Sequence, residues 1–131
     1  MRSFGEGILK NAKDITASAD GQIIILDKLK HDACMYIFSE DGHRQRKINI
    51  PKVNASVRDL GHLAWHSSGE CFVVAARTWN DDQSAVLIYD KDGEWKRTVG
   101  VEGNVSGITV SKEGYIAAVI HLNQTAKVIV F

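Results

Sequence analysis

Two histidines, His62 and His66, are the residues of this sequence whose type and spacing come nearest to a metal site. They stand four apart in "GHLAWHSSG", a stretch that reads as a β-strand, so both side chains lie on the same face of that strand. Imidazole nitrogens bind zinc, and a second pair of histidines would complete a set of four ligands. The alternative is that both rings are solvated or bond to nearby carbonyl oxygens. The two histidines are candidate ligands only, and we predict no resident metal or other cofactor.

Basic side chains gather in the loops between the second and third predicted strands of each repeat and in the links between repeats. This surplus over Asp32, Asp81, Asp82 and Glu102 is a candidate binding rim, made of Lys10, Lys13, Lys28, Lys30, Lys52, Arg58 and Arg77. Basic and aromatic groups together bind single-stranded RNA through phosphate contacts and base stacking. A scattered surplus of this kind is also typical of an ordinary solvated surface.

Trp79 is the most distinctive side chain of this rim, because it stands beside Arg77 in the polar loop "RTWNDDQ". This loop reads as three residues longer than its counterparts. A tryptophan in a loop can be the centre of a protein interface. The other interpretation is a hydrophobic lid folded over its own sheet.

Composition describes a chain without an obvious charged or membrane partner. The 131 residues carry 16 basic and 16 acidic side chains, and 44% are apolar. No apolar run reaches the length of a membrane helix, and the N-terminal residues lack the apolar stretch of a signal peptide. Cys34 and Cys71 both lie in apolar runs, which favours reduced, buried thiols. We predict one cytoplasmic domain.

Three repeats organise the chain, in the segments 13–51, 58–103 and 105–131. Each has an apolar residue six positions before a glycine (Gly21, Gly69 or Gly114), then a continuous apolar run, a polar loop and a second strand. An Asp-Gly turn and a fourth strand follow in the first two repeats, and Asp-Gly is a strong hairpin signal. Four short strands every 40 to 50 residues are typical of a β-propeller blade. The predicted fold class is therefore all-β, a β-propeller with three blades per chain.

The third repeat ends at "AKVIVF", so its fourth strand is missing. The N-terminal "RSFGEG" matches "RTVGVEG" at 97–103, the fourth strand of repeat two. We therefore predict that residues 1–7 form a closing strand, supplied by a second copy in a six-bladed homodimer. The alternative is that the chain is a piece of a longer propeller.

The first repeat, "DITASADGQIIILDKLKHDACMYIFSEDGHRQRKI", resembles an NHL repeat, although the Asn-His-Arg loop of that family is reduced to "KLKHDA" here. The resemblance covers almost the whole chain and is closest to the propellers of tripartite-motif proteins. It implies a domain that recruits a protein or RNA partner.

Some six-bladed propellers are lactonases or lyases with a channel metal. The predicted inner strands carry one carboxylate, Asp14, and calcium takes six to eight oxygens. No Gly-x-Ser-x-Gly motif is present. We predict a protein-binding module that is not an enzyme, with RNA binding second and a channel metalloenzyme third.

Overall fold

The computed structural model describes residues 2–29, 32–50 and 57–131. These ranges contain eleven strands in three antiparallel sheets. We call the sheets blades, and each follows the chain order of its strands. Blade one is β1 (Ala12–Ala17), β2 (Ile23–Lys28), β3 (Ala33–Phe38) and β4 (Arg44–Ile50). Blade two is β5 (Val57–His66), β6 (Cys71–Thr78), β7 (Gln83–Asp90) and β8 (Trp95–Glu102). Blade three is β9 (Asn104–Val110), β10 (Ile116–Leu122) and β11 (Thr125–Val130).

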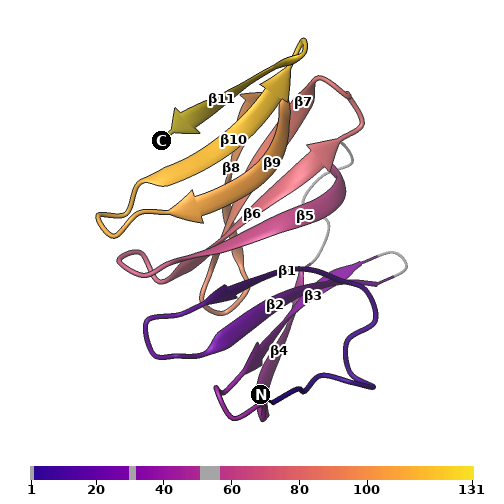
Figure 1. The fold of residues 1–131 in the computed structure, drawn as a ribbon, viewed down its shortest axis with the longest axis vertical. Helices are drawn as coiled ribbons and strands as arrows, with labels where there is room; N and C mark the ends of the chain where they lie inside the picture. The colour runs from indigo at the N-terminus through magenta and orange to yellow at the C-terminus, as the bar shows by residue number, and fades with distance from the viewer. Residues whose placement is uncertain (1, 30–31, 51–56) are drawn as a thin grey trace.

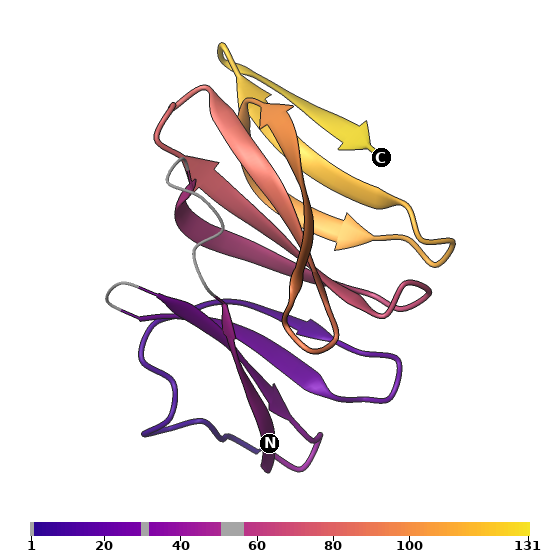
Figure 2. The ribbon, with the colours of Figure 1, turned by 180° about the vertical axis from the view of Figure 1, so that it is seen from behind.

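The three blades stack face to face along the long axis of the molecule, with the first strands β1, β5 and β9 side by side (Figure 1). The later strands of blades one and two lie on the far side, as the view from behind shows (Figure 2). Adjacent inner strands and outward-running sheets are the arrangement of consecutive propeller blades. The prediction of an all-β, propeller-like fold is confirmed. The structure contains a single chain, so a six-bladed ring stays a prediction.

Blade two is the middle layer and is apolar on both faces. Leu63, Phe72 and Leu87 pack against blade one, whereas Val73 and Val86 pack against blade three. This arrangement explains the continuous apolar runs of the sequence, because a strand that is buried on both faces has apolar side chains at successive positions and not at alternate ones.

Four of the described hairpins close with the same turn. At Ser18, Ser39 and Ser111 the hydroxyl accepts a backbone N–H four residues later, and at Asp90 a carboxylate oxygen does so. The third residue after each is a glycine with φ between 80° and 94°, a region that glycine enters without strain. In the β5–β6 hairpin the left-handed residue is Glu70, with φ 48°, and not the aligned Gly69. Strand pairing of His66 with Cys71 makes that turn one residue shorter than the others.

The N-terminal segment lies against blade one instead of extending as a strand. Residues 2–5 belong to no strand, and the ring of Phe4 is 5.1 Å from that of Phe38. Arg2 forms an ion pair with Asp41 at 3.2 Å. The reason is that no other blade covers this face of blade one among the described residues, so the segment buries the apolar side chains of Tyr36 and Phe38 within the same chain. The expected closing strand 1–7 is therefore not formed in the single chain, and exchange between copies stays a prediction.

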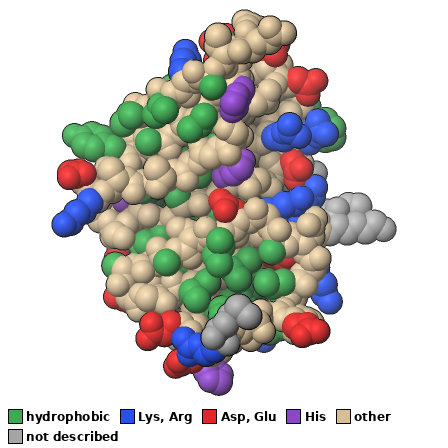
Figure 3. Space-filling model, viewed as in Figure 1, with side chains coloured by type: hydrophobic (Ala, Val, Ile, Leu, Met, Phe, Trp, Pro, Cys, Tyr) green, Lys and Arg blue, Asp and Glu red, His purple; other side chains and the backbone are tan. Residues whose placement is uncertain are grey.

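Blade three presents an open side. β11 pairs with β10 on one edge, and no strand of the described residues lies on its other edge. Val128 and Val130 are 65% and 61% exposed on the face that points away from blade two. Figure 3 shows hydrophobic side chains on the surface over blade three, at the upper left, and over blade one, below.

Candidate functional site

The candidate site is the rim of blade two, where the loop 79–82 meets the start of β5 and β9. Trp79 is 65% exposed, and the Arg58 guanidinium lies 5.6 Å from the centre of its ring. Arg58 is also 3.9 Å from the Asp81 carboxylate. The structure therefore brings together Trp79, Arg58 and Arg77, three of the residues predicted from the sequence, and it does not bury Trp79 as a lid.

The loop that carries Trp79 is held by backbone hydrogen bonds. Gln83 N–H donates to Asn80 O at 3.0 Å, and Gly103 N–H donates to Asp82 O at 2.6 Å. The loop 79–82 has four residues, the same number as 29–32 and two more than 123–124, so the prediction that it is three residues longer than its counterparts was wrong. The extra residues extend β6 and β7 to eight residues each, against six in β2 and β3. Trp79 is consequently presented by a short, fixed turn.

The other predicted rim residues do not join this cluster. Lys28 forms an ion pair with Asp59 at 2.7 Å and so links blade one to blade two. The side chains of Lys10 and Lys13 are exposed at the start of blade one. Lys30 and Lys52 lie outside the described residues. Figure 3 shows basic side chains along the right-hand edge of the molecule with acidic ones between them.

His66 is a structural residue that joins two blades. Its Nδ1 accepts the Gly69 N–H at 2.9 Å, so the proton lies on Nε2, which donates to Gly114 O at 2.8 Å. Both nitrogens are therefore used, and His66 cannot ligate a metal without losing these bonds. This is the second of the two interpretations left open by the sequence. The described residues contain no group of three or more side chains able to hold a metal ion.

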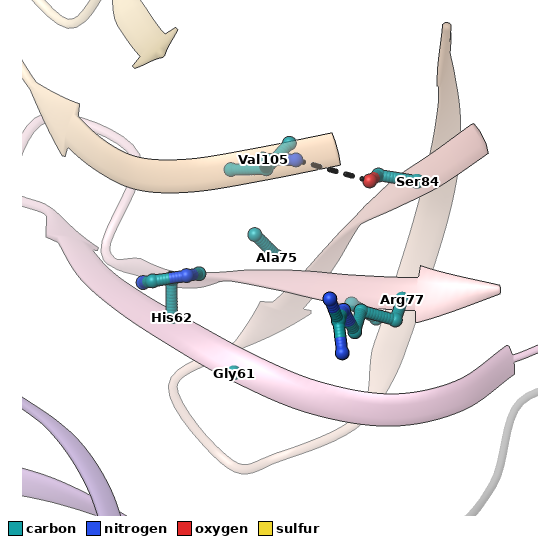
Figure 4. A pocket seen from close by; sticks show the side chains of 7 residues that line it. Gly61, His62, Ala75, Arg77, Ser84 and Val105 are labelled. Atoms are coloured by element: carbon teal, nitrogen blue, oxygen red, sulfur yellow. Dashed lines mark hydrogen bonds between the residues drawn. The ribbon is translucent and has the colours of Figure 1, made fainter. Parts of the chain in front are cut away.

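His62 lines a pocket of about 190 Å³ at the junction of blades two and three. The strand β5 is irregular between Leu60 and His62, where Gly61 interrupts the register with β6. The close-up shows His62 on β5 and Arg77 on β6 at this pocket, with Val105 of β9 opposite (Figure 4). The sequence singled out His62 for metal, and gave no sign that it shares a pocket with Arg77.

Two buried polar side chains, Ser84 and Asp27, were not identified from the sequence. Ser84 fixes the link between blades two and three, and Asp27 fixes the segment that precedes β1. The Ser84 hydroxyl donates to Gly103 O at 2.8 Å and accepts the Val105 N–H at 3.1 Å. The Asp27 carboxylate, fully buried, accepts the Asn11 N–H at 2.7 Å. Each is a polar residue at one end of an apolar strand, which is the only sequence signal they gave.

The inner strands end at a second hollow, of about 430 Å³, lined mainly by small side chains of all three blades. Thr16, Ser67, Ser68, Thr109 and Ser111 supply hydroxyls, and Lys112 supplies the only charge among the lining residues. Asp14, the one inner-strand carboxylate considered for a channel metal, instead accepts the Leu63 N–H at 2.7 Å and ties β1 to β5. The geometry thus gives no support to a channel metal or acid–base pair here.

Burial raises the pKa of the thiols of Cys34 and Cys71, and both cysteines are free. Neither faces the rim, since Cys34 is in blade one and Cys71 is in the β5–β6 hairpin.

The described residues contain no helix with the length and apolarity needed to cross a membrane.

Comparison with known proteins bears on the fold alone. No family model matches the chain, and no curated protein matches it. Among solved structures it is similar to a protein of unknown function from Bacteroides caccae, with 18% identity and a TM-score of 0.54, over 90% of this chain and 41% of that one. It is also similar to the Dos1 propeller, with 16% identity and a TM-score of 0.47, over 75% of this chain and 25% of that one. The chain thus spans less than half of the first structure and a quarter of the second.

The chain is therefore an all-β scaffold of three antiparallel sheets in a propeller-like arrangement, with a rim of charged and aromatic side chains on blade two.

Proposed function

We propose that this scaffold is a non-enzymatic, NHL-like interaction module that binds a protein partner through the rim of blade two. The observation that carries the proposal is Trp79, a large apolar side chain 65% exposed on a hydrogen-bonded turn. Tryptophan and arginine dominate the energetics of protein interfaces, because each offers a large contact area together with hydrogen-bond donors. The ring of Trp79 is already oriented by Arg58, so little ordering is left for the partner to impose.

RNA binding is less favoured by the same geometry. Two of the rim cations, Lys28 and Arg58, are paired with Asp59 and Asp81. These carboxylates would also repel a phosphate backbone, whose binding requires several unneutralised cations.

Selection of peptides tests the proposal directly. A library of random 12-residue peptides, displayed on phage, is selected against the immobilised chain, and each clone is retested on Trp79→Ala and Trp95→Ala. Trp95 is the matched control, since it is 46% exposed but lies on β8, at the β7–β8 hairpin. We expect clones that lose binding with Trp79→Ala and keep it with Trp95→Ala. A library that yields no such clone contradicts the proposed function.

We also propose that two chains associate, each closing the third blade of the other. The support is the open edge of β11, the exposed Val128 and Val130, and the match of residues 2–7 to 97–103. In the dimer the N-terminal segment would leave its own blade one and pair with the partner's β11.

Light scattering measures this association. We expect a species of twice the 14.5 kDa chain mass, which becomes monomeric in the Val128→Lys/Val130→Lys double variant and on deletion of residues 1–7. Asn49→Lys, a change at another exposed strand position, on β4, is the control and should leave the mass unchanged. A monomeric wild-type chain contradicts self-association and favours a longer propeller that supplies the other blades.

A further inference from the structure

Two adjoining pockets on the rim of blade two share one side chain, Arg77. The first is lined by Gly61, His62, Ala75, Ala76, Arg77, Ser84 and Val105. The second, of about 180 Å³, is lined by Arg58, Arg77, Thr78, Asp81 and Asn104. Arg77 is exposed and projects from β6 between them, with His62 on the neighbouring strand (Figure 4).

Arg77 is a cation without a carboxylate partner among the described residues. Its neighbours are paired, Arg58 with Asp81 at 3.9 Å and Lys28 with Asp59 at 2.7 Å. Every Asp and Glu of the chain lies within the described ranges, and none of these side chains forms an ion pair with Arg77. The guanidinium also donates no hydrogen bond to those residues. The Arg77 guanidinium is therefore free to bind a partner's carboxylate, and it lies beside the imidazole of His62.

The walls of the first pocket are fixed. The Ser84 hydroxyl is used by Gly103 O and the Val105 N–H, so it holds β9 against β7 and offers no free donor. Ala75 and Ala76 are buried and small, which leaves room above β6. The free donors are thus those of Arg77 and the His62 ring, and a planar carboxylate matches the fork of a guanidinium.

The geometry points to a binding site for one acidic side chain of a partner peptide, an Asp or Glu held by Arg77 and His62 next to an apolar contact on Trp79. A single carboxylate neutralises the Arg77 guanidinium, whereas a polyphosphate would bring additional negative charge close to Asp59 and Asp81. The inference rests on the proposed function, and it adds the chemical class of the partner.

Amidated synthetic peptides, made from the clones that depend on Trp79, test the inference by a double-mutant cycle. Each Asp or Glu of the peptide is replaced in turn by Asn or Gln, and affinity is measured for the wild-type chain and for Arg77→Gln. We expect one acidic position whose amide weakens binding to the wild-type chain by about 10-fold or more, as a charge-assisted bond implies. Binding to Arg77→Gln should be weaker by a similar factor and insensitive to the same replacement.

Arg44→Gln is the matched control, since Arg44 is an exposed arginine on β4 and should keep the wild-type response. The inference is overturned if Trp79-dependent peptides share no acidic position, or if the amide weakens binding equally to wild type and Arg77→Gln. In both cases the proposed function stands. It is also overturned if a fluorescein-labelled 12-nucleotide oligouridine binds at the rim and competes with the peptides. If no clone depends on Trp79, the proposed function fails and the inference falls with it.

Discussion

Replacing Asp27 with alanine should detach the N-terminal segment from blade one at a measurable cost. The buried carboxylate accepts the backbone N–H of Asn11 at 2.7 Å. Its two oxygens also accept the backbone N–H of Lys10, at 3.1 and 3.2 Å. A hydrogen bond to a charged group contributes about 1.5–3 kcal/mol. Because the two N–H groups are only partly buried and regain water, we expect Asp27→Ala to lower the free energy of unfolding by about 2–3 kcal/mol.

Urea unfolding followed by tryptophan fluorescence measures the loss. With a slope of about 2 kcal/mol per molar urea, the midpoint should fall by about 1–1.5 M. Asp27→Asn should lose less, because its amide oxygen still accepts one bond. Each variant is measured at several protein concentrations, since association would make the midpoint depend on concentration.

Asp41→Ala provides the matched control, because Asp41 holds the same segment through Arg2 but from an exposed position. Its side chain is 68% exposed and that of Arg2 70%, so the change should cost less than about 0.5 kcal/mol. Equal and small losses for Asp27→Ala and Asp41→Ala would refute the reasoning. They would mean that burial of the carboxylate adds nothing to the attachment of the segment.

Three further predictions concern packing, titration and a turn. Gly93→Ala should cost about 2–4 kcal/mol in a thermal or urea melt, since φ is 89° and a Cβ would overlap Ile48; Gly107→Ala, with open space, should cost less than about 1 kcal/mol. Burial raises the pKa of Tyr89 to about 12 from 10.0, so the free energy of unfolding should fall as the pH rises between these values. Unfolding curves at alkaline pH measure this fall, and Tyr89→Phe should remove it. Tyr89→Phe should cost little at neutral pH, because the buried hydroxyl has no hydrogen-bond partner among the described residues. Gln124→Gly should raise the melting temperature, with a gain of about 0.5–1 kcal/mol in the free energy of unfolding. The reason is that Asn123 and Gln124 form a two-residue turn with positive φ, of 51° and 65°, which glycine adopts without strain. An unchanged or lower melting temperature would contradict strain at this turn.

The repeat pattern was enough to predict the blades, because hydrophobic runs and turn residues are local signals. The runs "QIIIL" and "CFVVAA" became the buried strands β2 and β6, and the glycines at 21, 42, 93 and 114 became turn residues with positive φ. Gly69 aligns with Gly21 and Gly114 in the repeats, but it does not have a positive φ. The turn at 67–70 is one residue shorter than the others, which places Glu70 in the left-handed region. The spacing of residues in the sequence does not reveal this difference, because it depends on how β5 pairs with β6.

The rim was predictable in part, since the order of strands within a blade decides which loops share an end. That order placed Arg58, Arg77 and Trp79 together, although 19 residues separate Arg58 from Arg77. The roles of His62 and His66 were not predictable, because they depend on which atoms of another blade lie opposite. His66 meets the carbonyl of Gly114, 48 residues away, and His62 faces a pocket. The path of residues 2–5 also depends on a tertiary contact, between Phe4 and Phe38.

The hairpin turn shared by Ser18, Ser39, Asp90 and Ser111 bears on how the chain folds in time. In each, the side-chain acceptor and its N–H donor are four residues apart, so the turn can close before any blade meets another. The bonds that join blades are of a different kind: Asp14 reaches Leu63 across 49 residues, and His66 reaches Gly114 across 48. Because closing such distances has a larger entropic cost, hairpins should form early, and the docking of finished blades should set the folding rate.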